Sequence, residues 1–338
     1  MPQIEELYPG KRWGTFDLMQ KTYNCDSSKS FTDLPYIFFD TAFVSPVIPL
    51  VSKQIQALSA QKNDYNDKCH SFYLDLADSL TFNYHPDNFK LGTGFYFPKM
   101  INNTSDYIEK ASPQLINKLK QLRNNGIKIL LMTASHIDYT ELLMNYCYGD
   151  NWKDLFDVIC CRIKKPGFFS FPANTRPFYI WNEKESCAGL DAIAELNTTD
   201  IFLEGHWSVV DKWIRSQEGS NGITAYVGDS FKSDILPTKL YTSWKIIAVV
   251  QEGRKFMDGM ANHEHINKKR HIIDSNETFG TFFGSKEKPT MNAGKLLEHS
   301  DLTINDIEVL RSIEEDEELN VGNGNFYQFY PFEVEGPH

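Results

Sequence analysis

Two carboxylates lie close together in the segment ITAYVGDSFKSD, which runs from Ile223 to Asp234. An apolar run ends at Gly228 and Asp229, and Asp234 follows five residues later. Open α/β sheets often build their sites from a strand that delivers an acidic residue to its carboxyl end, just before a helix. Carboxylate and hydroxyl oxygens suit a hard cation such as Mg²⁺. The spacing therefore indicates a cation site, although a plain tight turn at Asp229 would explain the same residues.

Two other apolar runs, upstream, end in groups that can bind phosphate. Thr133, Ala134 and Ser135 follow the first run, and their hydroxyls and backbone amides can hold phosphate oxygens before a helix N-terminus. Lys165 follows the second run and would supply a point positive charge to a phosphoryl group. A helix cap at Thr133 and a surface position for Lys165 are the ordinary explanations. The occurrence of all these groups at successive strand ends favours a phosphate site.

The elements that must position these groups alternate regularly between helix and strand. Ser112 and Pro113 are typical of a helix start, and Gly126 is typical of a left-handed helix end. The run over 127–132 is nearly all apolar, as in a strand buried on both faces. Further helices lead to expected strands at 157–161, 223–227 and 244–250. This alternation predicts parallel strands with right-handed crossovers.

The predicted fold class is α/β, with a Rossmann-like parallel sheet over residues 93–252 and a mostly helical cap. Residues 1–92 break the alternation and are expected to form the cap-like region. Residues 166–200 have the composition of a loop-rich insertion. Residues 253–338 are polar and contain an acidic run at 314–318, which predicts a partly disordered tail.

Composition argues against several classes of protein. At 338 residues, with 41% hydrophobic and 23% charged side chains, the chain has the composition of a globular protein. The net charge of −11 argues against a nucleic-acid surface, which needs a basic face. No apolar run reaches the length of a membrane span, and residues 1–20 lack a signal-peptide core, so a cytoplasmic location is expected. Cys160 and Cys161 are expected to be buried free thiols.

The order Thr/Ser, Lys-Pro and Gly-Asp-x-x-x-x-Asp resembles that of the haloacid-dehalogenase-like phosphohydrolases. Longer segments are similar to the cytosolic purine 5′-nucleotidase family. They include LLMTASHIDY at 130–139, KPGFFS at 165–170 and YVGDSFKSDI at 226–235. The resemblance extends from about residue 5 to residue 250, and no match is seen beyond about residue 285.

In this family an aspartate attacks the phosphorus, water hydrolyses the aspartyl-phosphate, and Mg²⁺ offsets the charge repulsion between nucleophile and phosphate. The resemblance implies that Asp229 and Asp234 bind Mg²⁺, with orientation of the lysine as an alternative role for Asp234. Lys165 would neutralise the phosphate, which makes Lys165 and Asp234 the expected catalytic residues. The segment Thr133–Ser135 would bind the phosphate oxygens. The implied substrate is a phosphorylated small molecule, such as a nucleoside monophosphate.

The family's nucleophile lies in an Asp-x-Asp-x-Thr motif on the first strand, and no such motif is found here. The apolar run from Tyr36 to Asp40 ends in an aspartate, but Ala42 stands where the second aspartate should be. The resemblance also assigns this run to the cap. We therefore expect the chain to begin inside the cap, without the first, central strand. A gap or a replacement strand is then expected between the strands that lead to Thr133 and Asp229, and exposed strand edges there would make the chain only marginally stable.

Other histidine and aromatic residues have structural explanations beside functional ones. His136 follows the phosphate loop and could touch a leaving group, whereas His206, at a helix start, is expected to be structural. The histidines between 263 and 271 lack tight metal-binding spacing. Aromatic residues that could stack on a base, although such residues are usually core, are Trp13, Phe72, Tyr73 and Tyr84.

Two functions of different classes stay open. One is Mg²⁺-dependent hydrolysis of a nucleoside monophosphate or another phosphomonoester. The other is that of a catalytically inactive relative, which binds phosphate or a partner protein without turnover. The missing Asp-x-Asp motif favours the inactive relative. The presence of Thr133, Lys165, Asp229 and Asp234 favours the hydrolase.

Overall fold

The computed structural model describes residues 50–53, 56–57, 78–79, 82–182, 187–189, 191–217, 222–250, 291–304 and 306–312. Contacts divide the chain into two compact units. Within the described residues, the N-terminal unit contains everything up to Ile214 except Ser112–Lys118. The C-terminal unit contains Ser112–Lys118 and everything from Arg215 onward. Each unit has its own sheet.

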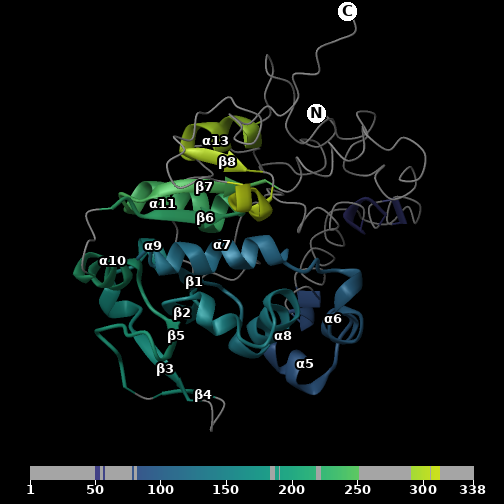
Figure 1. The fold of residues 1–338 in the computed structure, drawn as a ribbon. Coiled ribbons are helices and arrows are strands. Elements are labelled where there is room, and N and C mark those ends of the chain that lie inside the picture. The colour runs from purple at the N-terminus through teal and green to yellow at the C-terminus, as the bar shows by residue number, and fades with distance from the viewer. Residues whose placement is uncertain are drawn as a thin grey trace, which may run out of the picture. The chain divides into compact units, whose positions relative to one another are not determined.

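The N-terminal unit is built on a five-stranded sheet with the order β1-β2-β5-β3-β4, and Figure 1 shows these strands side by side. The strands are β1 (Leu130–Met132), β2 (Val158–Cys161), β3 (Phe178–Asn182), β4 (Cys187–Ala188) and β5 (Ile201–Glu204). β1, β2 and β5 are parallel, which confirms the α/β class predicted from the helix–strand alternation. β3 is antiparallel to β5 and to β4. The predicted loop-rich insertion at 166–200 therefore also carries strands.

Helices and short turns connect these strands. The helical elements are α5 (Pro86–Leu91), α6 (Phe97–Asn102), η2 (Thr104–Asp106), α7 (Pro113–Asn124), α8 (Ile137–Tyr148), η3 (Trp152–Leu155), α9 (Gly167–Ser170), η4 (Ala173–Thr175) and α10 (Trp207–Ser216). α7 spans the boundary between the two units. Its predicted start is confirmed, because Ser112 Oγ accepts a hydrogen bond from Leu115 N at 3.1 Å. The predicted left-handed end is also confirmed, since Gly126 has a φ of 87°.

One face of the parallel strands packs against α8 and η3. Ile159 and Cys161 of β2 form a buried cluster with Leu203 of β5, Ile137 of α8 and Trp152 of η3. β2 lies between two parallel neighbours, and all its residues are buried. This position fixes the carboxyl end of β2, from which the candidate phosphate site begins.

Cys160 and Cys161 are free thiols in the buried centre of the sheet, as predicted. Burial raises the pKa of Cys161 to about 11 and raises the pKa of Cys160 further. Both side chains therefore stay protonated near neutral pH and serve as core residues.

The C-terminal unit has a parallel three-stranded sheet with the order β6-β7-β8 (Figure 1). Its elements are β6 (Ala225–Gly228), η5 (Phe231–Ile235), α11 (Leu236–Tyr241), β7 (Lys245–Val249), α13 (Met291–His299), β8 (Leu302–Ile304) and η6 (Ile307–Ser312). α13 and β8 lie within residues 253–338, for which the sequence predicted a polar, partly disordered tail. A part of that range is thus an ordered component of the sheet.

The strands that lead to Thr133 and Asp229 belong to different sheets. β1 is the terminal strand of one sheet and β6 is the terminal strand of the other. Among the described residues, each of these strands has a strand partner on one side only. The gap or replacement strand expected between them stays a prediction. Most of residues 1–92, predicted to be a cap, lie outside the described residues, so the predicted domain limits remain a prediction.

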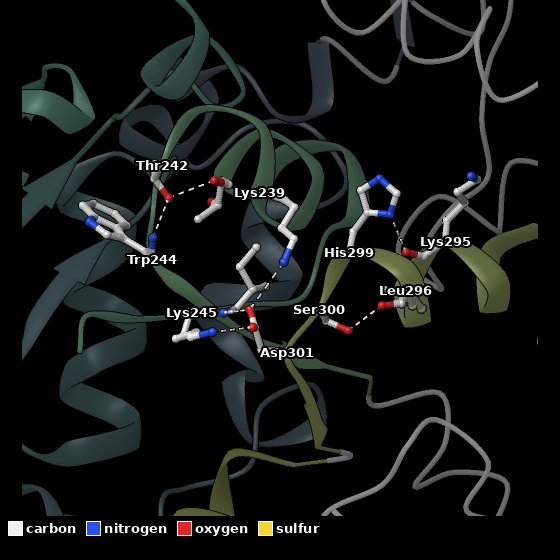
Figure 2. A network of polar contacts seen from close by, with 11 residues as sticks. Lys239, Thr242, Trp244, Lys245, Lys295, Leu296, His299, Ser300 and Asp301 are labelled. Carbon is white, nitrogen blue, oxygen red and sulfur yellow. Dashed lines mark hydrogen bonds and ion pairs between the residues drawn. The ribbon is translucent and has the colours of Figure 1, made fainter.

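Asp301 joins β8 to β7, as Figure 2 shows. Its Oδ2 accepts a hydrogen bond from Ile246 N at 3.0 Å, and its Oδ1 accepts one from Lys245 Nζ at 3.1 Å. Asp301 N donates in turn to Ile246 O at 2.9 Å. Burial by itself would raise the pKa of Asp301, but the hydrogen bonds from Ile246 and Lys245 outweigh burial and lower it.

Asp301→Asn is expected to reduce the free energy of unfolding by about 1–2 kcal/mol at neutral pH, because a charged acceptor is lost. A carboxylate whose pKa is lowered in the folded state stabilises the fold above its unfolded pKa of about 3.9, and this contribution disappears as the pH falls through the folded value. Urea unfolding should therefore show a constant difference down to about pH 5 and a smaller one below about pH 4.

The control for this prediction is Glu141→Gln, which removes an exposed ion pair with Lys153. Exposed pairs contribute little, so this variant should unfold like the parent protein. A difference for Asp301→Asn that persists unchanged in acid would contradict the assigned role of its charge.

None of the helices in the described ranges has the length and apolar character of a membrane span.

Candidate functional site

The predicted phosphate loop, Thr133–Ser135, directly follows β1 and precedes α8. Thr133 N donates to Cys160 O at 2.9 Å, which continues the β1–β2 ladder by one residue. Thr133 Oγ1 accepts a hydrogen bond from Ser135 N at 3.1 Å. The Thr133 side chain thus shapes the loop and keeps its own O–H as a donor. Thr133 and Ser135 are half-buried, and Ala134 is exposed.

Backbone hydrogen bonds tie this loop to the turn that carries Lys165. Arg162 N donates to Ser135 O at 2.8 Å, and Ile163 N donates to Thr133 O at 3.1 Å. Lys165 N donates to Ile163 O at 2.9 Å, and the Lys165 side chain is half-buried. The structure therefore brings the predicted phosphate loop and the turn of the predicted lysine together at the carboxyl ends of β1 and β2.

The loop supplies donors of the kind that an anion needs. The Ser135 amide is occupied by Thr133 Oγ1, whereas no described residue accepts a hydrogen bond from the Ala134 amide. α8 starts at Ile137 with His136 as its N-cap residue, and the His136 side chain makes no capping bond. Thr133 is therefore not the helix cap, which was the ordinary explanation for it. An N-terminus without a side-chain cap attracts negative charge.

The two candidate histidines of this unit differ in their surroundings. The pKa of His136 is lowered, first by burial and then by the nearby Arg162 charge, so His136 is neutral at neutral pH. His206 is buried, and its Nδ1 accepts a hydrogen bond from Ser208 N at 3.2 Å and lies 2.7 Å from Ser208 Oγ. These contacts stabilise the start of α10, which favours the structural role expected for His206.

The predicted cation-binding carboxylates lie in the C-terminal unit, in one loop after β6. Asp229 is exposed directly after the strand, whereas Asp234 is only 2% exposed. Asp234 Oδ1 accepts a hydrogen bond from Tyr226 Oη at 2.7 Å, and Oδ2 accepts one from Ser230 N at 3.2 Å. Burial, followed by the charge of Asp234, raises the pKa of Tyr226 well above its ordinary value. The Tyr226 hydroxyl therefore stays protonated and remains a donor.

A π-helical turn, η5, returns the chain from Asp229 to this buried position. The turn has a wider hydrogen-bond spacing than an α-helix, with Ile235 N donating to Ser230 O at 3.1 Å. Gly228 permits the approach, because a Cβ there would lie 2.5 Å from Asp234 Cβ. The loop between Gly228 and Asp234 is therefore closed by the Asp234 carboxylate.

The donor set suits Mg²⁺ at Asp229 better than at Asp234. Mg²⁺ is usually bound through one or two carboxylates, and substrate phosphates and waters complete its coordination. Asp229 provides an exposed carboxylate, whereas both oxygens of Asp234 already accept hydrogen bonds. These contacts favour a supporting role for Asp234, and direct Mg²⁺ binding by it stays a prediction. The described ranges contain no cluster of three or more His, Cys, Asp or Glu side chains arranged for a metal.

The sequence did not identify two of the residues that position these loops. Tyr226 was assigned only to the strand, although a buried tyrosine usually finds a partner for its hydroxyl. Glu204, at the end of β5, accepts ion pairs from Arg162 and Lys164, which flank Ile163. No local pattern marks Glu204, because its partners are distant in the sequence.

Most of the remaining candidates fall on residues that the structure does not describe, and Tyr84 is the exception. Asp40, the possible nucleophile, lies outside the described residues, as do the histidines between 263 and 271 and the aromatic residues Trp13, Phe72 and Tyr73. Tyr84 is 40% exposed, and its ring centroid lies 4.9 Å from that of Tyr96.

Comparisons with known proteins agree with the resemblance found in the sequence. A family model described as the 5′ nucleotidase family matches residues 1–299. The 5′-nucleotidase domain-containing protein 1 of Bos taurus is 29% identical over 294 residues, which cover 86% of this chain and 60% of that protein. The Homo sapiens protein of the same name is 28% identical over the same coverage. The 5′-nucleotidase domain-containing protein 2 of Homo sapiens is 28% identical over 251 residues, or 74% of this chain and 44% of that protein.

The chain spans about 60% of the length of the first two relatives. The family match covers most of its residues and includes both predicted loops. The chain belongs to the 5′-nucleotidase family.

Proposed function

We propose that this chain is a Mg²⁺-dependent phosphomonoester hydrolase that releases phosphate from nucleoside monophosphates. Membership of the 5′-nucleotidase family supports this class of activity. The observation that carries the proposal is the joined structure of the phosphate loop and the lysine turn, in which Ile163 N donates to Thr133 O at 3.1 Å. A cytoplasmic location is part of the same proposal.

Each residue has a separate role in the proposed reaction. The Thr133 hydroxyl and the Ala134 amide bind phosphate oxygens, and Lys165 neutralises part of the phosphate charge. Asp229 holds the cation, and Asp234 maintains the loop that presents Asp229. When bound, Mg²⁺ offsets the negative charge that repels a nucleophile from a phosphate. No described residue is assigned as the nucleophile.

Asp229→Asn is expected to reduce Mg²⁺-dependent phosphate release by roughly a hundredfold or more, because removal of a charged ligand weakens transition-state stabilisation. The assay measures phosphate released from nucleoside monophosphates by the full chain over a range of Mg²⁺ concentrations. The variant should also need more Mg²⁺ to reach half of its maximal rate.

The matched control is Asp191→Asn, the same substitution at an exposed position of the N-terminal unit. It should leave phosphate release unchanged. Equal activity of the Asp229→Asn variant and the parent protein would refute the assignment of the cation site. Phosphate binding without any turnover would instead favour the second function, that of a non-catalytic relative.

A further inference from the structure

An unusual backbone conformation is found at the carboxyl end of both neighbouring strands, β2 and β5. Arg162, directly after β2, has a φ of 51°, and Glu204, the last residue of β5, has a φ of 64°. A positive φ is uncommon for residues with a Cβ and persists only where the surroundings enforce it. The strand register pairs Cys161 with Leu203, so Arg162 and Glu204 are the next pair along this edge of the sheet.

The side chains of Arg162 and Glu204 form an ion pair, and Lys164 contacts the same Glu204 oxygen. Arg162 Nη2 lies 2.9 Å from Glu204 Oε1, and Lys164 Nζ lies 3.2 Å from the same oxygen. The Glu204 side chain is only 17% exposed, which limits screening of its charge by solvent. One carboxylate therefore fixes both residues that flank Ile163.

The backbone of the same segment holds the phosphate loop. Arg162 N donates to Ser135 O at 2.8 Å, and Ile163 N donates to Thr133 O at 3.1 Å. Lys164 directly precedes Lys165. Glu204 is thus connected to the phosphate loop through Arg162. It is connected to the lysine turn through Lys164.

We propose that Glu204 is a positioning residue that fixes the phosphate loop and the lysine turn in the arrangement that binds phosphate. This inference rests on the proposed function of the loop. Without the carboxylate, the neighbouring charges of Arg162, Lys164 and Lys165 repel one another, and Arg162 and Lys164 lose the carboxylate that both of them contact. The Arg162 Nε is buried without a partner in this part of the chain, which disfavours the present position of the side chain, so the ion pair with Glu204 is needed to hold it there.

Removal of Glu204 also frees positive charge, which by itself would favour phosphate binding. The Lys164 side chain is 52% exposed, so water and salt screen most of its charge. Loss of the loop geometry therefore outweighs the freed charge, and the net effect is weaker phosphate binding.

The test is the affinity of the full chain for inorganic phosphate in the presence of Mg²⁺, measured by isothermal titration calorimetry. Glu204→Gln should weaken phosphate binding roughly tenfold, as is typical when a residue that orients a binding group is removed. Glu204→Gly removes the carboxylate and also relieves the positive φ, so it should weaken binding by a similar factor. Restored binding in Glu204→Gly would show that backbone strain, and not the ion pair, matters, and would overturn the proposal.

A double-mutant cycle supplies a readout that a general loss of stability would not change. In an Arg162→Gln background, Glu204→Gln should weaken phosphate binding much less than it does alone, because the pair acts as a unit. The matched control is Glu141→Gln, which removes the exposed pair with Lys153 at 2.7 Å and should leave phosphate affinity unchanged.

The outcomes also separate this inference from the function on which it rests. A parent protein that binds no phosphate overturns the proposed function and the role of Glu204 with it. A parent protein that binds phosphate, with a Glu204→Gln variant of equal or higher affinity, overturns only the role of Glu204.

Discussion

Gly205→Ala is expected to lower the free energy of unfolding by about 3 kcal/mol, the sum of overpacking and an unfavourable backbone conformation. A Cβ at this position would lie 2.1 Å from two carbons of the Phe178 ring. Phe178 is fully buried and packs against the rings of Phe168 and Phe202, at 6.4 and 5.9 Å between centroids. The ring therefore has no free space into which it could move.

The matched control for this prediction is Gly126→Ala. Gly126 and Gly205 share a φ of 87°, but a Cβ at Gly126 would meet nothing within 4 Å. Gly126→Ala should lower the free energy of unfolding by only about 1–2 kcal/mol, which is the contribution of the backbone conformation alone. Equilibrium unfolding of the full chain in urea measures both values. Equal losses in the two variants would contradict the proposed clash with Phe178.

Asp234→Ala is expected to lower the free energy of unfolding by about 3 kcal/mol, because it leaves buried donors without an acceptor. The Tyr226 hydroxyl and the Ser230 amide both donate to this carboxylate, at 2.7 and 3.2 Å. The loop that carries Asp229 would also lose the contact that closes it. Mg²⁺-dependent phosphate release should therefore fall together with stability.

Tyr226→Phe is the comparison variant, because it removes one hydrogen-bond donor to Asp234 and keeps the aromatic ring. The centroid of this ring lies 6.2 Å from that of the stacked Trp244 ring. Tyr226→Phe should lower the free energy of unfolding by about 1–2 kcal/mol. This loss is smaller than that of Asp234→Ala, because the Ser230 amide keeps its acceptor. Thermal or urea unfolding can rank the two variants. A larger loss in Tyr226→Phe than in Asp234→Ala would show that the carboxylate is not the centre of the loop.

Much of the parallel framework could be predicted from local sequence. Apolar runs bounded by clear helix signals marked β1, β2, β6 and β7. Only β2 is buried at every residue, as a continuous apolar run predicts, whereas β6 has both exposed and buried residues. β8 could not be recognised in this way. It has only three residues, and its partner strand β7 is distant in the sequence, as is Ile246, which donates a hydrogen bond to Asp301 just before β8.

The candidate loops were predictable in their residue types but not in their shapes. Thr133, Lys165 and Asp229 could be selected as candidates because each follows a strand, and parallel sheets often place functional groups at strand ends. The left-handed conformation of Glu204 could not be predicted, because residue 204 is neither a glycine nor an asparagine. The π-helical turn that buries Asp234 is likewise set by its contact with Tyr226, which only the folded chain reveals.

The most direct test of the account is the release of phosphate from nucleoside monophosphates by the full chain, with and without Mg²⁺. The account predicts phosphate release that requires Mg²⁺ and that is lost when the cation is removed by a chelator. Release at the same rate without Mg²⁺, or no release with Mg²⁺ present, would contradict the proposal that this chain is a Mg²⁺-dependent hydrolase.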